Sequence, residues 1–380
     1  MNRYRTEFPT LASGIHLLSH SLGPVPRAVR DSMIAYCDAW EHHTSEDAWA
    51  TTWWTLSRHV GDRIARILGG KPGSLQIQPN ASIGLATDAS CFHFHSGRRN
   101  KVVTTALDFP SMEYIWNAQR QIGADVEVLS SADGVSVELE QILDAIDDRT
   151  CLVALSHTSY RSSYRIDAQA IVERAHAKGA LVLMDVYQSA GVLPLHAAEW
   201  KVDFLIGGTI KWLCGGPSCG YLYVRPDLQR DLSPRLTGWV AHDSPFDFAP
   251  APMRYARSVR RFAQGTPSIP ALYSAIPGLD ILESVGLTQI AAESQRRTQR
   301  MIDFALSRGW TVNTPLDVNK RGGSVMIGVN NAPAVVESLA ERRVFVDSRP
   351  SAGLRISPHF FNTDEEVDEA MNVLASLIDR

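Results

Sequence analysis

Short apolar runs and segments with helical spacing alternate along the chain from about residue 75 to about residue 226. Seven runs have the length and composition of strands: LQIQP, KVVTTALDF, DVEVLS, CLVALSH, ALVLMD, VDFLIGG and GYLYV. The helical segment DAQAIVERAHAKG lies between two of them, with Asp167 at its start and Gly179 at its end. Because parallel strands need long crossovers, usually helices, the alternation predicts an α/β fold with a large, doubly wound, mainly parallel, seven-stranded sheet.

The pattern changes after about residue 226, where a segment rich in proline and aromatic residues has no regular spacing. A long helical stretch from about 270 to 308 follows, and short strands and helices come after it. These elements predict a smaller C-terminal α+β domain. We expect an N-terminal segment, 1–25, that packs with the small domain, a large domain, 26–260, and the small domain, 261–380.

The charge balance of the 380-residue chain disfavours some partners. Its formal net charge of −4 gives no general attraction to nucleic acid or to a membrane, and we expect neither as a partner. The first residues, MNRYRTEFPT, lack the apolar core of a signal peptide, and no apolar run is long enough to span a bilayer. A cytoplasmic location is therefore expected.

The cysteines and histidines do not predict a metal site. The cysteines are Cys37, Cys91, Cys151, Cys214 and Cys219. They have no zinc-ligand spacing, and several lie in apolar runs, as buried thiols in a reducing compartment do. The pair His42-His43 and the run Cys91-x-His93-x-His95 lack a metal context, so we expect structural roles there and no bound metal.

An acid and a lysine follow two of the apolar runs. Asp185 ends ALVLMD, and Lys211 follows VDFLIGG in the glycine-rich segment LIGGTIKWLCGGP. In a doubly wound sheet, ligand chemistry lies at the carboxyl ends of the strands. A lysine holds pyridoxal phosphate (PLP) as a Schiff base, and an acid keeps the pyridine nitrogen of PLP protonated, so this pair predicts a PLP site. A surface lysine and a helix-capping or ion-paired aspartate are the structural alternatives.

A natural phosphate site lies where the first of these strands gives way to a helix. Asn80, Ala81 and Ser82 form this turn. Free backbone N–H groups and the positive end of the helix dipole favour an anion at such a place. Simple helix capping is the alternative role, and it is compatible with phosphate binding.

Eight segments, in order along nearly the whole chain, resemble those of fold-type I PLP-dependent enzymes of the class V aminotransferase superfamily. The segments are HLLSHSLGPVP, DFPSMEY, LSHTSYRSS, MDVYQSAG, LIGGTIKWLCGGP, LTGWVAH, FAQGTPS and LRISPHFFN. Within the superfamily, they are most similar to kynureninase and its relatives. The resemblance implies the fold-type I transferase fold, PLP as cofactor and a small-molecule amino acid as substrate.

The resemblance assigns Lys211 and Asp185 as the catalytic lysine and the partner of the ring nitrogen. It implies that the turn at residues 80–82 holds the PLP phosphate, with the Ser82 hydroxyl contributing. Kynureninases usually have a tyrosine directly before the lysine, and this chain has Ile210 there. We expect Thr209 to replace the phosphate contact that this tyrosine makes.

Other residues are expected around the ring of the cofactor. Phe109 resembles the aromatic residue that stacks on the ring, with a core phenylalanine as the alternative. Glu113 lies where kynureninases often have an acid near the cofactor. Gln188 lies where the superfamily has His or Gln near the ring and its 3-oxygen, and typical kynureninases have His.

Two loops are expected to reach a second subunit. By resemblance, Trp239 in LTGWVAH and Thr266 in AQGTPS contact the PLP phosphate of the neighbouring protomer. This implies a homodimer with composite active sites. Packing within the loops of one chain is the alternative.

Substrate contacts are expected from both ends of the chain. Arg355 in GLRISPHF resembles the arginine that binds the substrate α-carboxylate, and the planar fork of arginine suits a carboxylate. Asn362 is expected to assist it. His20, Ser21 and Tyr160 lie in segments that line the pocket in related enzymes.

Several reactions fit these residues. A kynureninase-like hydrolase cleaves the Cβ–Cγ bond after water adds to the γ-carbonyl, and it releases alanine and an aromatic acid. Class V transamination, epimerisation or lyase chemistry, and a non-catalytic PLP-binding homologue are the alternatives. Cysteine desulfuration is disfavoured because it needs a cysteine in the C-terminal third, and the last cysteine is Cys219.

Overall fold

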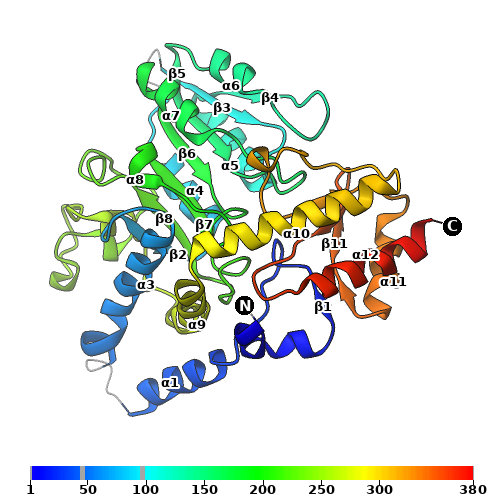
Figure 1. The fold of residues 1–380 in the computed structure, drawn as a ribbon. Coiled ribbons are helices and arrows are strands. Elements are labelled where there is room, and N and C mark those ends of the chain that lie inside the picture. The colour runs from blue at the N-terminus through cyan, green and yellow to red at the C-terminus, as the bar shows by residue number, and fades with distance from the viewer. Residues whose placement is uncertain (1, 43–47, 95–98, 380) are drawn as a thin grey trace.

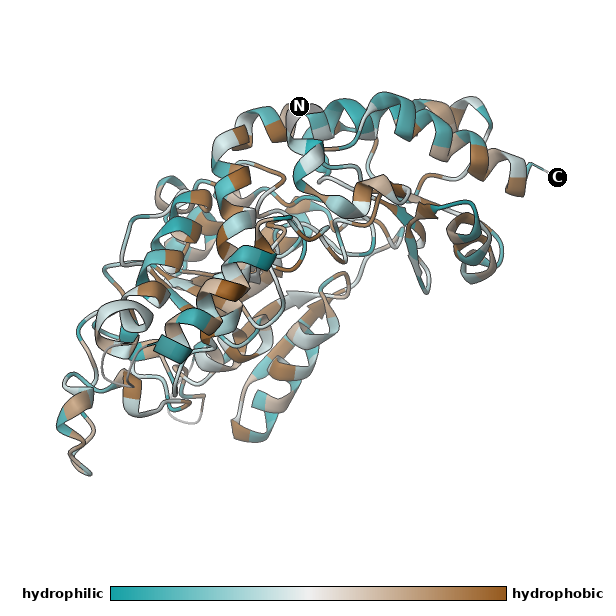
Figure 2. Cartoon of the chain, turned by 90° about the horizontal axis from the view of Figure 1, so that it is seen from below, coloured by the Kyte–Doolittle hydropathy of each residue, from teal (hydrophilic) through white to brown (hydrophobic). Residues whose placement is uncertain are grey.

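The computed structural model describes residues 2–42, 48–94 and 99–379 (Figure 1). His43 and His95, two of the histidines considered above, lie outside these residues. Within them, no helix is both long enough and apolar enough to cross a membrane. Figure 2 shows hydrophilic and hydrophobic residues side by side on the helices, as is typical of helices with one face on a protein core.

A seven-stranded sheet forms the centre of the molecule, in the order β2-β8-β7-β6-β5-β3-β4. Its strands are β2 (Leu75–Gln78), β3 (Lys101–Thr105), β4 (Asp125–Leu129), β5 (Thr150–Ser156), β6 (Leu181–Asp185), β7 (Phe204–Gly208) and β8 (Gly220–Val224). The pairs from β4 to β7 are parallel, and β8 is antiparallel to β7 and β2. The predicted mainly parallel, seven-stranded α/β fold is confirmed.

Helices cover both faces of this sheet. They are α3 (Trp54–Ile67), α4 (Ala81–Ala89), α5 (Pro110–Gln119), α6 (Leu139–Ala145), α7 (Ala168–Ala177), α8 (Ala197–Trp200) and α9 (Ile269–Val285), and α1 (Val29–His42) packs on α9. Along β6, Val182 and Met184 belong to one apolar cluster and Leu183 to another. Because successive side chains of a strand point to opposite faces, the sheet is buried on both sides. The helix predicted to start at Asp167 is α7, and Asp167 caps it by accepting a hydrogen bond from the Ala170 N–H at 3.0 Å.

A second apolar core lies at the C-terminal end of the chain. Its elements are α10 (Leu287–Ser307), β9 (Val325–Ile327), α11 (Ala332–Glu341), β10 (Val344–Phe345), β11 (Asp347–Arg349), β12 (Gly353–Ile356) and α12 (Asp364–Ile378). The N-terminal strand β1 (Ile15–His16) pairs in parallel with β10, and Ile15 lies in this core. Figure 1 shows α10 running between the sheet and these C-terminal elements.

The division into 1–25, 26–260 and 261–380 stays a prediction. Helix α9 packs against α1 and α3, and its Leu272 and Leu279 lie in the apolar cluster of the large sheet. Helix α10 contributes Ile290 to that cluster and Met301 to the C-terminal core. Helix α10 therefore contributes to both cores.

Candidate active site

A cavity of about 270 Å³ lies at the carboxyl ends of β5 and β6, beside the N-termini of α4 and α5. Many of the residues predicted to act on a cofactor or a substrate line it. They are Asn80, Ala81, Ser82, Phe109, Tyr160, Asp185, Gln188 and Lys211. Segments far apart in the sequence meet at one place because parallel strands end at the same edge of the sheet.

Lys211 presents its amine to this cavity. The Nζ atom lies 4.2 Å from the centroid of the Tyr187 ring and 5.8 Å from that of Phe109. Removal from water lowers the pKa of Lys211 to about 8, although the Asp185 carboxylate acts in the opposite direction. With such a pKa, roughly a tenth of the molecules carry the free amine at pH 7, far more than for an ordinary lysine, and this form is the one that acts as nucleophile and proton carrier.

Asp185 ends β6, and its Oδ1 accepts a hydrogen bond from the Tyr187 N–H at 2.8 Å. Removal from water raises the pKa of this carboxyl to about 6, and the Tyr187 N–H and Lys211 oppose the rise. Its Oδ2 accepts no hydrogen bond from the described part of the chain. The carboxyl is therefore able to receive a cationic N–H that enters the cavity.

The turn before α4 has the geometry of an anion site. Asn80 caps α4 through its Oδ1, which accepts from the Ile83 N–H at 2.9 Å, and the N–H groups of Ala81 and Ser82 have no partner within the helix. Ser82 Oγ donates to Ser111 Oγ at 3.1 Å, so two hydroxyls lie together at this end of the cavity. A Cβ added to Gly220 would lie 2.5 Å from the Asn80 carbonyl carbon, so only glycine lets β8 approach the turn so closely.

Aromatic and amide side chains complete the wall. The half-exposed ring of Phe109 meets the ring of Tyr160 edge-on, with centroids 5.1 Å apart. Gln188 is held in place at both ends of its amide. Its Nε2 donates to the His20 carbonyl at 3.0 Å, and its Oε1 accepts from Trp212 Nε1 at 3.2 Å.

The predicted carboxylate-binding arginine is already paired. Arg355 is buried, and its Nε and Nη2 donate to the two oxygens of Asp347 at 2.8 and 2.6 Å. Asp347 Oδ1 also lies 2.8 Å from Nε2 of His20. Burial lowers the pKa of His20 to about 4, so this imidazole is neutral near pH 7. Arg355 and His20 do not themselves line the cavity.

Other predicted residues lie outside the cavity. Thr209 is buried, and its hydroxyl donates to the Gly216 carbonyl at 3.0 Å. Asn362 donates to the His16 carbonyl and to Glu366, and accepts from the His359 N–H, which are contacts within the C-terminal core. The Ser21 N–H donates to the Leu18 carbonyl, and Glu113 is exposed on α5. Their predicted roles stay predictions.

The two residues expected to reach a partner also lie outside the cavity. Trp239 is 39% exposed and packs in an aromatic cluster with Trp54, Phe246 and Phe248. Thr266 is exposed and lines a separate groove that also contains Trp54. Their predicted contacts with the cofactor of a partner stay predictions.

The sequence reasoning missed several residues of the site. Tyr187 and Ser111 line the cavity, and Asp347 pairs with Arg355. Tyr187 lies between Asp185 and Gln188 in the segment MDVYQSAG, and this position is a signal in the sequence for its place in the site. No local signal in the sequence connects Asp347 with Arg355, because their pairing depends on the register of β11 against β12.

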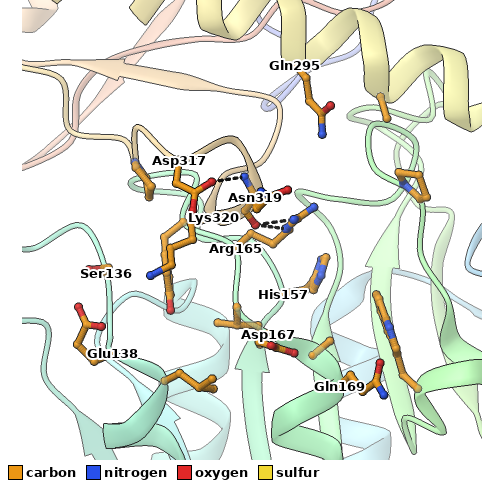
Figure 3. Close-up of a pocket in the computed structure, with 18 of the residues that line it drawn as sticks. Ser136, Glu138, His157, Arg165, Asp167, Gln169, Gln295, Asp317, Asn319 and Lys320 are labelled. Atoms are coloured by element: carbon orange, nitrogen blue, oxygen red, sulfur yellow. Dashed lines mark hydrogen bonds between the residues drawn. The ribbon is translucent and has the colours of Figure 1, made fainter.

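A larger cavity lies elsewhere. About 970 Å³ in volume, it lies between α10 and the large sheet domain and is lined by His157, Trp200, Asp317 and Lys320, among others. Figure 3 shows Arg165 within it, donating to the Asn319 carbonyl, where Nε makes the bond at 2.9 Å. None of the predicted site residues lines this cavity.

On α1, the exposed Asp38, Glu41 and His42 have possible ligand atoms within 4.8 Å of one another, a common arrangement on protein surfaces without a metal.

The residues of the smaller cavity fit PLP. A free amine, an acid able to meet a ring nitrogen and a helix N-terminus with two hydroxyls are the groups that an aldehyde, a pyridine and a phosphate require. Lys211 would hold the aldehyde carbon, Asp185 the ring nitrogen, and the turn at 80–82 the phosphate.

Comparisons with known proteins give the family. Residues 80–369 match the family described as Aminotransferase class-V. An uncharacterized aminotransferase, YcbU, of Bacillus subtilis (strain 168) is 32% identical over 98% of this chain and 97% of its own length. A kynureninase of Bacillus anthracis is 27% identical over 99% of this chain and 91% of its own length.

Solved structures agree on the fold. An apo cysteine desulfurase from Thermococcus onnurineus NA1 superposes with a TM-score of 0.89 at 21% identity, covering 99% of this chain and 98% of that one. A mutant of C-DES with glycine covalently linked to its PLP cofactor superposes with a TM-score of 0.88 at 19% identity, covering 98% of both chains. With the matched family and the geometry of the cavity, the chain belongs to the class V aminotransferase family and is a PLP-dependent enzyme of fold type I.

Proposed function

We propose that the chain acts on the α-carbon and side chain of an amino acid held in the cavity at Lys211. The observation that carries this proposal is that Lys211, Asp185 and the N-terminus of α4 line one cavity. PLP, when bound, supplies an electron sink for the charge that develops at the substrate α-carbon. Lys211 Nζ takes the α-proton. The Asp185 carboxylate would stabilise the positive charge on the pyridine nitrogen of PLP. Phe109 shields the site from water.

Arg355 is proposed to bind the substrate α-carboxylate. The guanidinium is buried and held in place by Asp347, and its charge is felt at Lys211, whose pKa falls mainly through burial and further through this charge. A fixed cation near the reacting amine favours one orientation of an amino acid, because the carboxylate binds to one side and the amine to the other.

The reaction proposed first is kynureninase-like hydrolysis. Its support is the kynureninase of Bacillus anthracis, which is similar over 99% of this chain. In this reaction, water adds to the γ-carbonyl of the substrate side chain, and the Cβ–Cγ bond breaks. Alanine and an aromatic acid are the products. Gln188 in place of the usual histidine, and Ile210 in place of the usual tyrosine, point to a substrate related to kynurenine rather than to kynurenine itself.

Transamination is the second candidate, and the 32% identical aminotransferase relative favours it. Its products are a keto acid and the amine form of the cofactor. Epimerase or lyase chemistry stays a further alternative, and a non-catalytic role has less support, since Lys211, Asp185 and Arg355 are all present. The cysteine desulfurase neighbour supports the fold alone at 21% identity, and no cysteine follows Cys219 to carry sulfur in the C-terminal third.

We further propose a homodimer in which the partner covers the cluster at Trp239. Phe246 and Phe248 in this cluster are 58% and 73% exposed, and large exposed aromatic groups mark interaction sites. Sedimentation analysis at several concentrations should give twice the chain mass. We also propose a cytoplasmic location, since cysteines in apolar runs are typical of proteins in a reducing compartment.

A panel of amino acids tests the reaction. Kynurenine, 3-hydroxykynurenine, cysteine conjugates and common α-amino acids are incubated with the holoenzyme, and the products are identified by mass spectrometry. Alanine with an aromatic acid supports the hydrolase, and a keto acid with pyridoxamine phosphate supports the transaminase. A Lys211→Ala variant with normal turnover would contradict both, whereas Lys320→Ala in the other cavity should behave as wild type.

A further inference from the structure

Asp347 is the centre of a charged cluster beside the candidate active site. It lies on β11 directly opposite Arg355 on β12 in the antiparallel register. Its Oδ1 contacts His20 Nε2 and Arg355 Nε, both at 2.8 Å, and its Oδ2 contacts Arg355 Nη2 at 2.6 Å and Arg349 Nη1 at 3.1 Å. One carboxylate therefore holds groups from the N-terminal segment and from both C-terminal strands.

These contacts leave part of the Arg355 guanidinium free. An arginine has five N–H donors, one on Nε and two on each terminal nitrogen. Asp347 accepts from Nε and Nη2, and the Tyr160 carbonyl accepts from Nη1 at 3.0 Å. One N–H on Nη1 and one on Nη2 remain without a partner in the described residues. This pair matches the two oxygens of a second carboxylate.

The charges of the cluster also favour an anionic group. Burial acts to raise the pKa of Asp347, but the hydrogen bonds from His20 and Arg355 hold it well below its usual range, so Asp347 is ionised. Its charge offsets one of the two arginines, and the neutral His20 adds none. The cluster is thus cationic overall, and its members Arg355, Arg349 and Asp347 all influence the pKa of Lys211.

We propose that Asp347 is a positioning residue for the substrate carboxylate. It acts through Arg355: it occupies one side of the guanidinium and leaves the terminal N–H pair for the substrate. His20 contacts Asp347 through Nε2 and Ser357 Oγ through Nδ1, the latter at 2.6 Å, and it fixes the carboxylate in turn. This inference rests on the proposed function, in which Arg355 binds the α-carboxylate.

The role of Asp347 in carboxylate binding can be measured with two amines that differ only in a carboxylate. L-alanine and ethylamine are titrated separately into the holoenzyme, and the visible absorption of bound PLP reports their dissociation constants. The ratio of the two constants measures what the carboxylate contributes. Wild type should prefer L-alanine, Arg355→Gln should lose the preference, and Asp347→Asn should reduce it by about 10-fold or more, because a displaced or reoriented guanidinium pairs less well.

Two further variants separate positioning from a general loss of structure. Asp368→Asn removes an exposed aspartate that makes the same two-point contact with Arg300 far from the cavity, and it should keep the wild-type ratio. Asp347→Glu keeps the charge and should recover part of the preference. At saturating L-alanine, the exchange of its α-hydrogen with solvent should change much less in Asp347→Asn than the dissociation constant does.

The possible failures are distinguishable. If Arg355→Gln keeps the preference for L-alanine, or if wild type has none, the proposed function is wrong at this residue and the inference falls with it. If Arg355→Gln loses the preference and Asp347→Asn retains it in full, the proposed function stands and the inference about Asp347 is overturned. If Asp347→Asn does not fold, the same criterion applies to Asp347→Ser, which also removes the carboxylate and overturns the inference if its ratio equals that of wild type.

Discussion

The ring of Tyr187 lies 4.2 Å from Nζ of Lys211, measured to the ring centroid. This contact closes one side of the lysine and helps to keep water from its amine. The space for the ring exists because residue 208 is glycine, where a Cβ would lie only 2.4 Å from the Tyr187 hydroxyl. The strand that leads to the lysine is therefore shaped to accept the aromatic residue that follows Asp185.

We expect the apoprotein to capture PLP faster as the pH rises from 7 to 9, with a midpoint near 8. The folded-state pKa of Lys211 is lowered to about 8, and only the free amine attacks the aldehyde. Rapid mixing of apoprotein with PLP at a series of pH values, followed by borohydride reduction and mass spectrometry, measures this dependence. A midpoint at the ordinary lysine pKa of about 10.4 would show that the pKa of Lys211 is not lowered.

Asp185→Asn should reduce turnover on the order of 10²-fold or more, since a neutral amide cannot stabilise a protonated ring nitrogen. The asparagine carbonyl still accepts from the Tyr187 N–H, so the fold should be preserved. The Asp185 charge raises the pKa of Lys211, so its loss should move the midpoint for PLP capture to lower pH. Turnover and the pH profile are measured on the same preparation, and an unchanged midpoint would argue against this electrostatic link.

Gly220→Ala should weaken PLP binding and lower the free energy of unfolding by about 1–3 kcal/mol. The added Cβ would lie 2.5 Å from the Asn80 carbonyl carbon and 2.9 Å from the Ala81 nitrogen, at the turn proposed for the phosphate. Equilibrium dialysis gives the affinity for PLP, and urea denaturation of the apoprotein gives the stability. Full retention of PLP affinity would mean that the turn does not hold the cofactor.

Asp88→Asn should make unfolding less dependent on pH. Asp88 lies on α4, fully buried, and neither carboxyl oxygen has a hydrogen-bond partner within the described ranges. Burial raises its pKa well above 3.8, and Asp203 adds to the effect. The folded state thus keeps a proton that the unfolded state releases, so the stability present at low pH is lost as pH rises above 3.8 towards the folded pKa.

Over that range, the free energy of unfolding of wild type should fall relative to that of Asp88→Asn by at most about 1.4 kcal/mol per pH unit. Urea denaturation of both proteins at several pH values measures the difference. Equal slopes for the two proteins would show that Asp88 is ionised in the folded state. Asp148→Asn, at an exposed position paired with Lys178, serves as the control for removing an aspartate.

The sequence by itself determined the sheet and the centre of the site. Alternating strand and helix patterns act over windows of about ten to fifteen residues, and this range is enough to predict parallel strands. Ligands of such sheets bind at the carboxyl ends of the strands. Asp185 at the end of β6 and Lys211 after β7 were therefore expected at the same edge. The helix start at Asn80 needed only local capping preferences.

Only the tertiary structure decided the partners of Arg355 and the positions of Thr209 and Trp239. Arg355 meets Asp347 through strand register, and Asp347 in turn meets His20 from the other end of the chain; no periodic pattern encodes either contact. Thr209 lies two residues from Lys211 in sequence, yet the glycine-rich turn directs its hydroxyl to Gly216. Contacts between distant segments depend on how whole elements pack, because loop closure and side-chain fit are properties of the folded chain.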